Sequence, residues 1–312
     1  MKWTAGQLPD LTGTVAVVTG GNSGIGWHTS HELAAHGARV VLACRDRARA
    51  GIAADRIRAK APSAQVEVAE LDLAAMDSVR SFAEGWTGPL DLLVNNAGVR
   101  APPKPVRTVD GYELQFGTNH LGHYVLTGLL LPSLLKAPAG RVVTVSSIAH
   151  FGGTAAVVEG NVGESYNSQH TYSNSKLANL LFAFELHREL TARGLPVTSV
   201  AAHPGVSATG LVADPAGMGA NPVLRYVAPV FLKVFTQSAT AGARSTLYAA
   251  TAAEPGSYTG PGRFGETRGP IGKAKRLPLA DDEALARQLW TVSEELTGLH
   301  YPWTSSAVGG HP

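Results

Sequence analysis

The sequence has little of what would place it in several large classes of protein. Its one cysteine, Cys44, excludes an internal disulfide and suits a reducing compartment. No stretch reaches the roughly 18 consecutive apolar residues of a membrane-spanning helix, and residues 1–10 lack the apolar run of a signal peptide. The net charge is +2, without a basic block, so a nucleic-acid role has no electrostatic support. We therefore expect a cytoplasmic protein with no membrane span and no nucleic-acid partner.

Apolar runs separated by helical segments are the main pattern of this 312-residue chain, in which 44% of the residues are hydrophobic. The continuous run at 15–18 is typical of a parallel strand that is buried on both faces. Further strands are predicted at 39–43, 65–68, 90–94, 141–145 and 196–202, and a short last strand is expected near 257–259. The alternation predicts an α/β fold: a single doubly wound, Rossmann-type domain over 1–303, with helices on both faces of a seven-stranded parallel sheet and a mobile tail at 304–312.

A glycine-rich turn follows the first predicted strand. It reads Thr19-Gly20-Gly21-Asn22-Ser23-Gly24-Ile25-Gly26 and leads into a helix that we expect to end near His36. A strand, a glycine turn and a helix N-terminus together form an anion site, because backbone N–H groups and the helix dipole favour a phosphate. The spacing is G-x-x-x-G-x-G rather than the common G-x-G-x-x-G. We predict that this turn binds a nucleotide.

Arg45 follows the second predicted strand, where the adenosine ribose of a dinucleotide normally lies. An acid at this point would bind the 2′-hydroxyl of NAD, whereas an arginine accommodates the 2′-phosphate of NADP. No acid precedes Arg45, so the sequence favours NADP(H) over NAD(H). The alternative is that Arg45 is a solvated charge paired with Asp46.

Polar residues also follow the later strands. Asp72 follows the third strand, Asn95-Asn96-Ala97-Gly98 the fourth, and Ser146-Ser147 the fifth. Ligands of a doubly wound sheet lie outside the carboxyl ends of its strands, at the point where the strand order reverses. We expect these residues to face one site.

Tyr172 and Lys176 are four residues apart, so on a helix they share one face. A cation close to a phenol favours the phenolate, so Lys176 is expected to lower the pKa of Tyr172 and make it a general acid/base. An amphipathic helix with a half-buried tyrosine and a solvated lysine is the alternative for the pair alone.

A long helix is predicted from about residue 111 to 135, with Asn119 in its middle. His120 and His123 lie three apart on it, but no cysteine or acid completes a ligand set, so no metal site is expected.

The segment from 210 to 236 mixes glycine and proline with many apolar residues, most of them between 223 and 235. We interpret it as a lid over a hydrophobic substrate. A membrane-surface or partner-binding face is the alternative.

Several of these motifs occur in the order found in the short-chain dehydrogenases/reductases, which the chain resembles over about residues 11–300. The motifs are Thr19-Gly20-x-x-x-Gly24-x-Gly26, Asn95-Asn96-Ala97-Gly98, Asn119, Ser147, Tyr172-x-x-x-Lys176 and Pro204-Gly205. The run Ala43-Cys44-Arg45-Asp46 and the 25-residue spacing from Ser147 to Tyr172 look most like the branch of the retinol dehydrogenases and protochlorophyllide reductases.

The resemblance implies a role for each matching residue. Tyr172 would be the acid or base, Lys176 would lower its pKa and hold the nicotinamide ribose, Ser147 rather than Ser146 would bond the substrate oxygen, and Asn119 would anchor a water that links Lys176 to solvent. The cofactor would meet Gly20, Asn22, Ser23, Gly24, Ile25 and Gly26 at the pyrophosphate, Asp72 and Leu73 at the adenine, Asn96, Ala97 and Gly98 along its length, and Val206 and Thr209 at the carboxamide.

These observations predict an NADP(H)-dependent carbonyl reductase or alcohol dehydrogenase that acts on a lipophilic small molecule. The alternatives are a module that binds NADP without turnover and an isomerase of the epimerase type. The resemblance also implies a homodimer or homotetramer formed through the helices that carry Asn119 and Tyr172.

Overall fold

The computed structural model describes residues 3–100, 104–160, 166–206 and 237–304, whose strands form one sheet. The strands are β1 (Val15–Thr19), β2 (Arg39–Cys44), β3 (Gln65–Glu70), β4 (Leu92–Asn95), β5 (Gly140–Val145), β6 (Val197–Ala202), β7 (Tyr258–Arg263) and β8 (Arg268–Lys273). Their order is β3-β2-β1-β4-β5-β6-β7-β8, so the chain reverses direction across the sheet between β1 and β4. This confirms the predicted Rossmann-type α/β fold.

The sheet has eight strands rather than the predicted seven, and it is not wholly parallel. β1 to β7 pair in parallel, but β8 returns beside β7 in an antiparallel hairpin. The prediction missed β8 and most of β7 because glycine and proline, which are depleted in strands, occur at 260–262, 269, 270 and 272. A register shift between Pro261 and Arg263 accommodates one of these interruptions.

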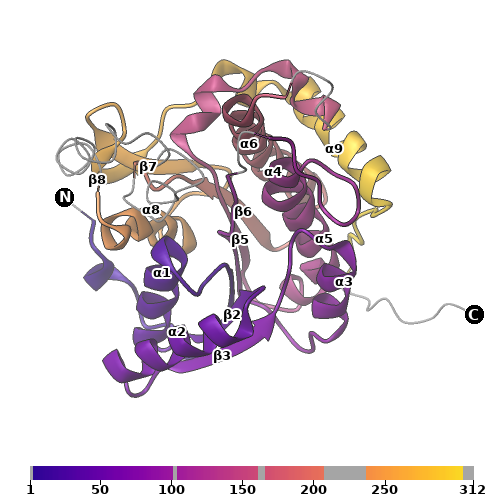
Figure 1. The fold of residues 1–312 in the computed structure, drawn as a ribbon. Helices are drawn as coiled ribbons and strands as arrows, with labels where there is room; N and C mark the ends of the chain where they lie inside the picture. The colour runs from indigo at the N-terminus through magenta and orange to yellow at the C-terminus, as the bar shows by residue number, and fades with distance from the viewer. Residues whose placement is uncertain (1–2, 101–103, 161–165, 207–236, 305–312) are drawn as a thin grey trace, which may run out of the picture.

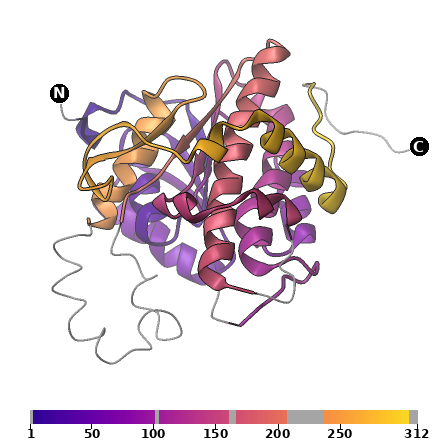
Figure 2. The ribbon, with the colours of Figure 1, turned by 90° about the horizontal axis from the view of Figure 1, so that it is seen from above.

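Helices cover both faces of the sheet, as Figures 1 and 2 show. The helices are α1 (Gly24–Ala35), α2 (Arg47–Lys60), α3 (Met76–Glu84), α4 (Leu114–Phe116), α5 (Gly122–Leu134), α6 (Ser168–Ala192), α8 (Ala239–Thr251) and α9 (Glu283–Thr297). Successive residues of a strand point to opposite faces. Val17 of β1 accordingly joins the core under α3, α5 and α6, whereas Ala16 and Val18 join the core under α1, α2 and α8.

The helix predicted for 111–135 is divided in the structure. α4 is followed by a π-helical segment, Gly117–Leu121, and only then by α5. The π-helical segment carries Asn119, whose amide nitrogen donates to the carbonyl of Val99 (3.0 Å) and whose amide oxygen accepts from the Val99 N–H (2.7 Å). Single π-helical turns are frequent at functional sites, because they shift side chains out of the regular helix register.

The chain's own C-terminal part covers α5 and α6. All residues of α5 are buried except Leu129, which is half-buried. Trp290 of α9 packs against Tyr124 and Phe182 at centroid distances of 5.2 and 6.0 Å, and Tyr301 packs against Tyr124 at 5.0 Å. The predicted dimer or tetramer therefore stays a prediction, and the helices assigned to its interface are packed against α9.

Some predictions fall outside the described residues. They are Thr209, the lid at 210–236 with its apolar set at 223–235, and the tail beyond Thr304. Within the described ranges, no helix combines the length and the apolar character that crossing a membrane requires.

Among the described residues, four histidines are buried, and burial lowers the pKa of each. The value falls to about 3 for His120, to about 4 for His123 and to about 3 for His203, and it is also lowered for His150. All four side chains are at most 1% exposed. They are therefore neutral in the folded protein at neutral pH.

Acid should destabilise the protein through these histidines. Below about pH 6.5 the unfolded chain binds protons that the folded chain excludes, so the free energy of unfolding falls by up to about 1.4 kcal/mol per pH unit for each histidine until its folded-state pKa is reached. We expect the melting temperature to fall between about pH 7 and about pH 5. His120→Gln should reduce the slope, and substitution of the exposed His300 should not. A melting temperature independent of pH over this range would contradict the account.

Candidate active site

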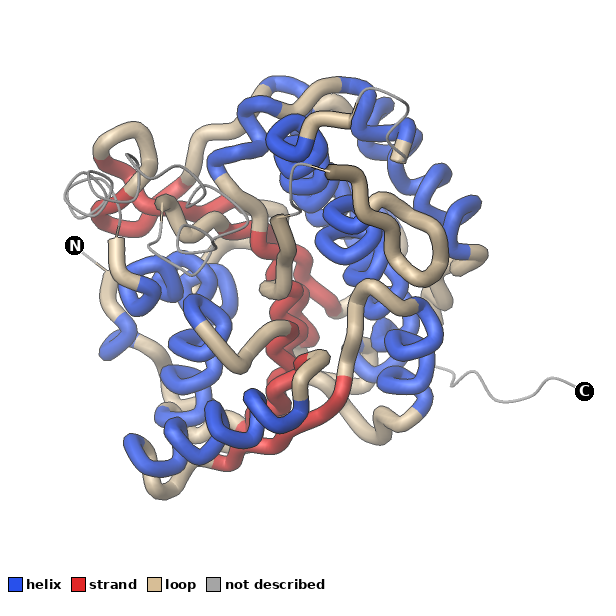
Figure 3. The backbone as a smooth tube through the Cα atoms, viewed as in Figure 1, coloured by secondary structure: helices blue, strands red, loops and turns tan. Residues whose placement is uncertain are grey.

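The predicted site residues converge at the carboxyl ends of the strands, on both sides of the reversal between β1 and β4. In chain order, the turn 20–26 follows β1, Arg45 follows β2, Asp72 and Leu73 follow β3, 96–98 follow β4, Ser147 follows β5 and Val206 follows β6. The strands run side by side through the middle of the molecule, so these ends meet along one edge of the sheet (Figure 3). Doubly wound sheets bind their ligands at this place.

The turns after β1 and β4 are in close contact. A Cβ at Gly26 would lie 2.4 Å from the carbonyl oxygen of Gly20 and 2.5 Å from the side-chain nitrogen of Asn96. That nitrogen donates to the carbonyl of Thr19 (2.8 Å), and Gly20 has a left-handed backbone, with φ +64°. Position 26 therefore requires glycine because there is no room for a Cβ, and position 20 favours glycine because its backbone is left-handed.

The first turn of α1 faces this edge without a side-chain cap. Ser23 is at the N-cap, but its hydroxyl makes no capping hydrogen bond. The first N–H groups of a helix have no partner within the helix, so here a bound anion can take them. The uncapped helix and the glycine cradle fit the pyrophosphate of a dinucleotide.

Arg45 lies immediately beyond β2 and is exposed. The neighbouring acid, Asp46, caps α2 instead, since its carboxylate accepts from the Arg49 N–H (2.9 Å). At the end of β3, the Asp72 carboxylate accepts from the Ala74 N–H (3.0 Å), and Leu73 is buried. Arg45 is thus placed where the 2′-position of a dinucleotide was predicted to lie.

Lys176 and Asn119 meet at Gly98. A Cβ at Gly98 would lie 3.3 Å from Nζ of Lys176 and 3.4 Å from Oδ1 of Asn119. Lys176 is 4% exposed, and its Nζ donates to the carbonyl of Val145 at the end of β5 (3.2 Å). Burial lowers the pKa of this ammonium to about 8. Asn119 is held by Val99 and by Ser175, whose hydroxyl accepts from Nδ2 (3.0 Å).

Two basic side chains, Lys176 and Arg100, lie near the ring of Tyr172. Nζ of Lys176 is 5.8 Å from the centroid of the phenol ring, and the guanidinium carbon of Arg100 is 5.5 Å from it. Burial raises the pKa of Tyr172, and a hydrogen bond with the Ser147 side chain and the charge of Arg100 act to lower it. The expectation that Lys176 lowers this pKa was wrong for this structure: Nζ is turned to a backbone carbonyl, and its own burial disfavours its charge.

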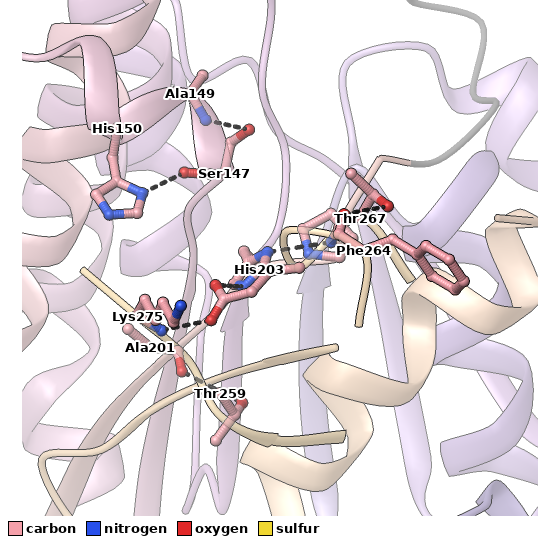
Figure 4. A network of polar contacts seen from close by, with 12 residues as sticks. Ser147, Ala149, His150, Ala201, His203, Thr259, Phe264, Thr267 and Lys275 are labelled. Atoms are coloured by element: carbon pink, nitrogen blue, oxygen red, sulfur yellow. Dashed lines mark hydrogen bonds and ion pairs between the residues drawn. The ribbon is translucent and has the colours of Figure 1, made fainter. Parts of the chain in front are cut away.

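The two serines after β5 have different surroundings. The hydroxyl of Ser146 is buried and donates to the carbonyl of Lys176 (2.7 Å), whereas Ser147 is half-buried beside Tyr172. The carbonyl of Ser147 accepts a hydrogen bond from Nδ1 of His150 (2.7 Å; Figure 4). The other ring nitrogen of His150, Nε2, accepts from the Leu277 N–H (3.2 Å). His150 therefore ties the Ser147 backbone to the segment after β8.

The loop after β6 is held by the β7–β8 hairpin, a contact that the sequence analysis missed (Figure 4). Nδ1 of His203 accepts from the Gly205 N–H (3.2 Å), so Nε2 carries the proton and faces the Glu266 carboxylate at 3.2 Å. Because burial lowers the pKa of His203 to about 3, its imidazole is neutral beside the Glu266 side chain. The Val206 N–H donates to the carbonyl of Thr267 (3.0 Å).

A strained turn makes these contacts. Phe264, Gly265 and Glu266 have φ values of 52°, 63° and 62°, all in the left-handed region. Such conformations are unfavourable for residues other than glycine and persist where the surroundings fix them. The only signal in the sequence was His203-Pro204-Gly205 after a strand, which does not reveal the distant Glu266.

Comparisons with known proteins agree with this geometry. The short chain dehydrogenase family matches residues 14–216 of the chain. Human retinol dehydrogenase 12 is 40% identical over 303 residues, which are 95% of this chain and 89% of the relative.

Two solved structures extend the comparison. The crystal structure of an uncharacterised protein from Mycobacterium Paratuberculosis is 43% identical, with a TM-score of 0.81, and the match covers 97% of this chain and all of that one. The structure described as an NAD(P) dependent gluconate 5-dehydrogenase from Beutenbergia cavernae with bound NADP is 26% identical, with a TM-score of 0.60. The match covers 78% of this chain and 91% of that one.

The chain belongs to the short-chain dehydrogenase/reductase family, in its retinol dehydrogenase-like branch. It is therefore an oxidoreductase of a family that uses a nicotinamide cofactor. Among the described residues, no three histidine, cysteine or acidic side chains form a cluster that could hold a metal ion.

A methyl group at Gly26 should disrupt the nucleotide cradle. Gly26→Ala places a Cβ against backbone and Asn96, which must move apart, so we expect a loss of stability and at least a ~10-fold weaker affinity for NADP⁺ in calorimetric titration. Gly51→Ala is the matched control: no atom lies within 4 Å of its Cβ, and alanine in a helix should stabilise by up to about 1 kcal/mol. Wild-type affinity in Gly26→Ala would show that the cradle does not hold the nucleotide.

Proposed function

We propose that the protein is an NADP(H)-dependent oxidoreductase that interconverts a carbonyl group and an alcohol on a lipophilic small molecule, with Tyr172 as the general acid/base. One observation carries the proposal: Tyr172 is hydrogen-bonded to the Ser147 side chain, and the Lys176 ammonium lies 5.8 Å from its ring centroid, next to the loop that contains Gly98. A proton donor, a second hydrogen-bond donor and a cation thus surround one point at the edge of the sheet.

Tyr172 is suited to protonate the substrate oxygen in reduction. Because burial raises the pKa of its phenol, Tyr172 is protonated at neutral pH, and an acid must be in that state. Ser147 can donate a second hydrogen bond to the same oxygen, where negative charge develops in the transition state. Lys176, whose pKa is lowered to about 8, can exchange a proton near neutral pH and replace the one that Tyr172 gives up.

The residues around the site fit a nicotinamide dinucleotide. Gly20, Gly26 and the uncapped N-terminus of α1 would hold the pyrophosphate, and Gly98 leaves room beside Lys176. The cofactor supplies the hydride when it is bound. The protein's part is to orient the substrate, to protonate its oxygen and to stabilise the developing charge.

Arg45 supports NADP rather than NAD, because an exposed guanidinium at the end of β2 can pair with a 2′-phosphate. The Beutenbergia cavernae neighbour is described with bound NADP, which agrees with this preference. A lipophilic substrate is supported by the name of the retinol dehydrogenase relative and by Phe151, which is 46% exposed in the 3₁₀ helix Ile148–Gly152 that follows Ser147.

The basic test is oxidation of NADPH and NADH by the purified protein, with aromatic, steroid-like, polyketide-like and retinoid carbonyls as substrates. Turnover with NADPH and little with NADH is expected. Binding of NADP⁺ without turnover of any substrate would instead favour a module that holds the nucleotide.

Tyr172→Phe should lower the rate ~10²- to 10⁴-fold, because it removes the proton donor and little else. The measurement is kcat with the best carbonyl substrate and NADPH. Tyr248→Phe is the matched control, since Tyr248 lies on α8 and packs against Trp3. Activity of Tyr172→Phe within about twofold of wild type would rule out the assigned role.

Arg45→Ala should weaken the binding of NADP⁺ by ~10-fold or more and the binding of NAD⁺ by much less, because only NADP⁺ has the 2′-phosphate. Calorimetric titration with both nucleotides measures the difference. Arg58→Ala makes the same charge change at the far end of α2, where Arg58 pairs with Asp55 (2.7 Å), and should affect neither. Equal losses for both nucleotides in Arg45→Ala would mean that the 2′-phosphate is recognised elsewhere.

A further inference from the structure

His123 of α5 is a buried polar side chain with a partner at each ring nitrogen. Nδ1 is 3.0 Å from the carbonyl oxygen of Asn119, and Nε2 is 2.9 Å from the hydroxyl oxygen of Thr19. The ring is 1% exposed and lies between the last residue of β1 and the π-helical segment that carries Asn119. The mechanism proposed above leaves this side chain without a role.

The partners of His123 fix its tautomer. A carbonyl oxygen can only accept a hydrogen bond, so Nδ1 carries the proton and donates to Asn119. The neutral ring then has a lone pair at Nε2, and the Thr19 hydroxyl must donate to it. Both bonds are satisfied in this tautomer alone.

The Thr19 hydroxyl connects the ring to the turn after β4. Its oxygen accepts from the N–H groups of Asn96 and Ala97, both at 2.9 Å. A hydroxyl has one donor and two acceptor positions, so all three are used when it donates to His123. The other acceptor within reach, the Val94 carbonyl, is more distant at 3.3 Å.

We infer that His123 is a positioning residue that couples the two halves of the active site. Through Thr19 it orients the Asn96–Ala97 backbone, which would line the cofactor, and through the Asn119 carbonyl it orients the π-helical turn beside Lys176. The inference deepens the proposed function and rests on it, because that proposal makes one half a cofactor site and the other half a catalytic site.

The surroundings of His123 keep it neutral, as the network requires. Burial and the positive charge of Lys176 lower its pKa to about 4. The other titratable group that faces it is His120, which is also neutral, with a pKa lowered to about 3. A protonated ring would donate at Nε2 as well, and Thr19 would lose its acceptor.

His120 provides an internal comparison. It lies three residues earlier and is equally buried, but its Nε2 donates to the Ser293 hydroxyl (2.8 Å), which in turn donates to the Leu289 carbonyl (2.7 Å). His120 therefore has the opposite tautomer and joins the helix to α9 rather than to the site.

Two substitutions separate the two bonds of His123. His123→Asn places an amide nitrogen near the position of Nδ1 and keeps the bond to Asn119, whereas His123→Gln places an amide oxygen near Nε2 and keeps the bond to Thr19. We expect His123→Gln to keep the Kd for NADP⁺ within about threefold of wild type and to lower kcat by ~10-fold. His123→Asn should do the reverse, with a ~10-fold weaker Kd and a smaller change in kcat.

His120→Gln is the control, and it should lower the melting temperature without changing Kd or kcat. Equal changes of Kd and kcat in both His123 variants, or wild-type values in both, would overturn the inference.

A second measurement does not depend on turnover. Two-bond ¹H–¹⁵N correlation spectra of the ¹⁵N-histidine-labelled protein report each ring's tautomer and charge, and the signals lost in His123→Gln identify this residue. A neutral ring protonated at Nδ1, at about pH 7 and at about pH 5, is expected. A ring protonated at Nε2, or a charged ring, would overturn the inference even if the enzyme is active. The expected tautomer in a protein that turns over no carbonyl would instead count against the proposed function alone.

Discussion

The close contact between the turn after β1 and the turn after β4 is the constraint on which the site depends. It leaves no space for a Cβ at Gly26, and it is bridged by the Asn96 side chain and by the Thr19 hydroxyl. The sheet reverses its strand order between these two strands, so their ends provide the opening where a dinucleotide can lie. Lys176 and Asn119 then meet at Gly98, on the turn after β4. A shift of either turn would move the proposed nucleotide cradle and the proposed catalytic residues together.

The fold was largely predictable because its physical signals are local. A continuous apolar run such as 15–18 is typical of a strand that is buried on both faces, and the helices between the predicted strands imply parallel pairing. The failure at β8 has an equally local cause: its glycines and Pro270 hide the strand, and only pairing with β7 reveals it. The π-helical turn around Asn119 could not be predicted either, since it depends on hydrogen bonds with Val99, 20 residues away.

The sequence correctly placed Tyr172 and Lys176 close together on one helix, because the two residues are only four apart. The site was not predictable where chemistry depends on burial or on distant partners. The pKa of Tyr172 is raised because its phenol is desolvated, and the spacing of residues in the sequence does not show desolvation. The contacts that act to lower this pKa are with Ser147 and Arg100 rather than with Lys176. Glu266 and His203 are 63 residues apart in the sequence, so their contact became visible only in the folded chain.

The most direct test of the account is the fate of a labelled hydride. The purified protein would be incubated with NADPH deuterated at the transferring position of C4 and with a lipophilic ketone or aldehyde, and the product would be analysed by mass spectrometry. The account predicts an alcohol with one deuterium on the former carbonyl carbon. An unlabelled product, or no alcohol from any carbonyl although the nucleotide is bound, would contradict it.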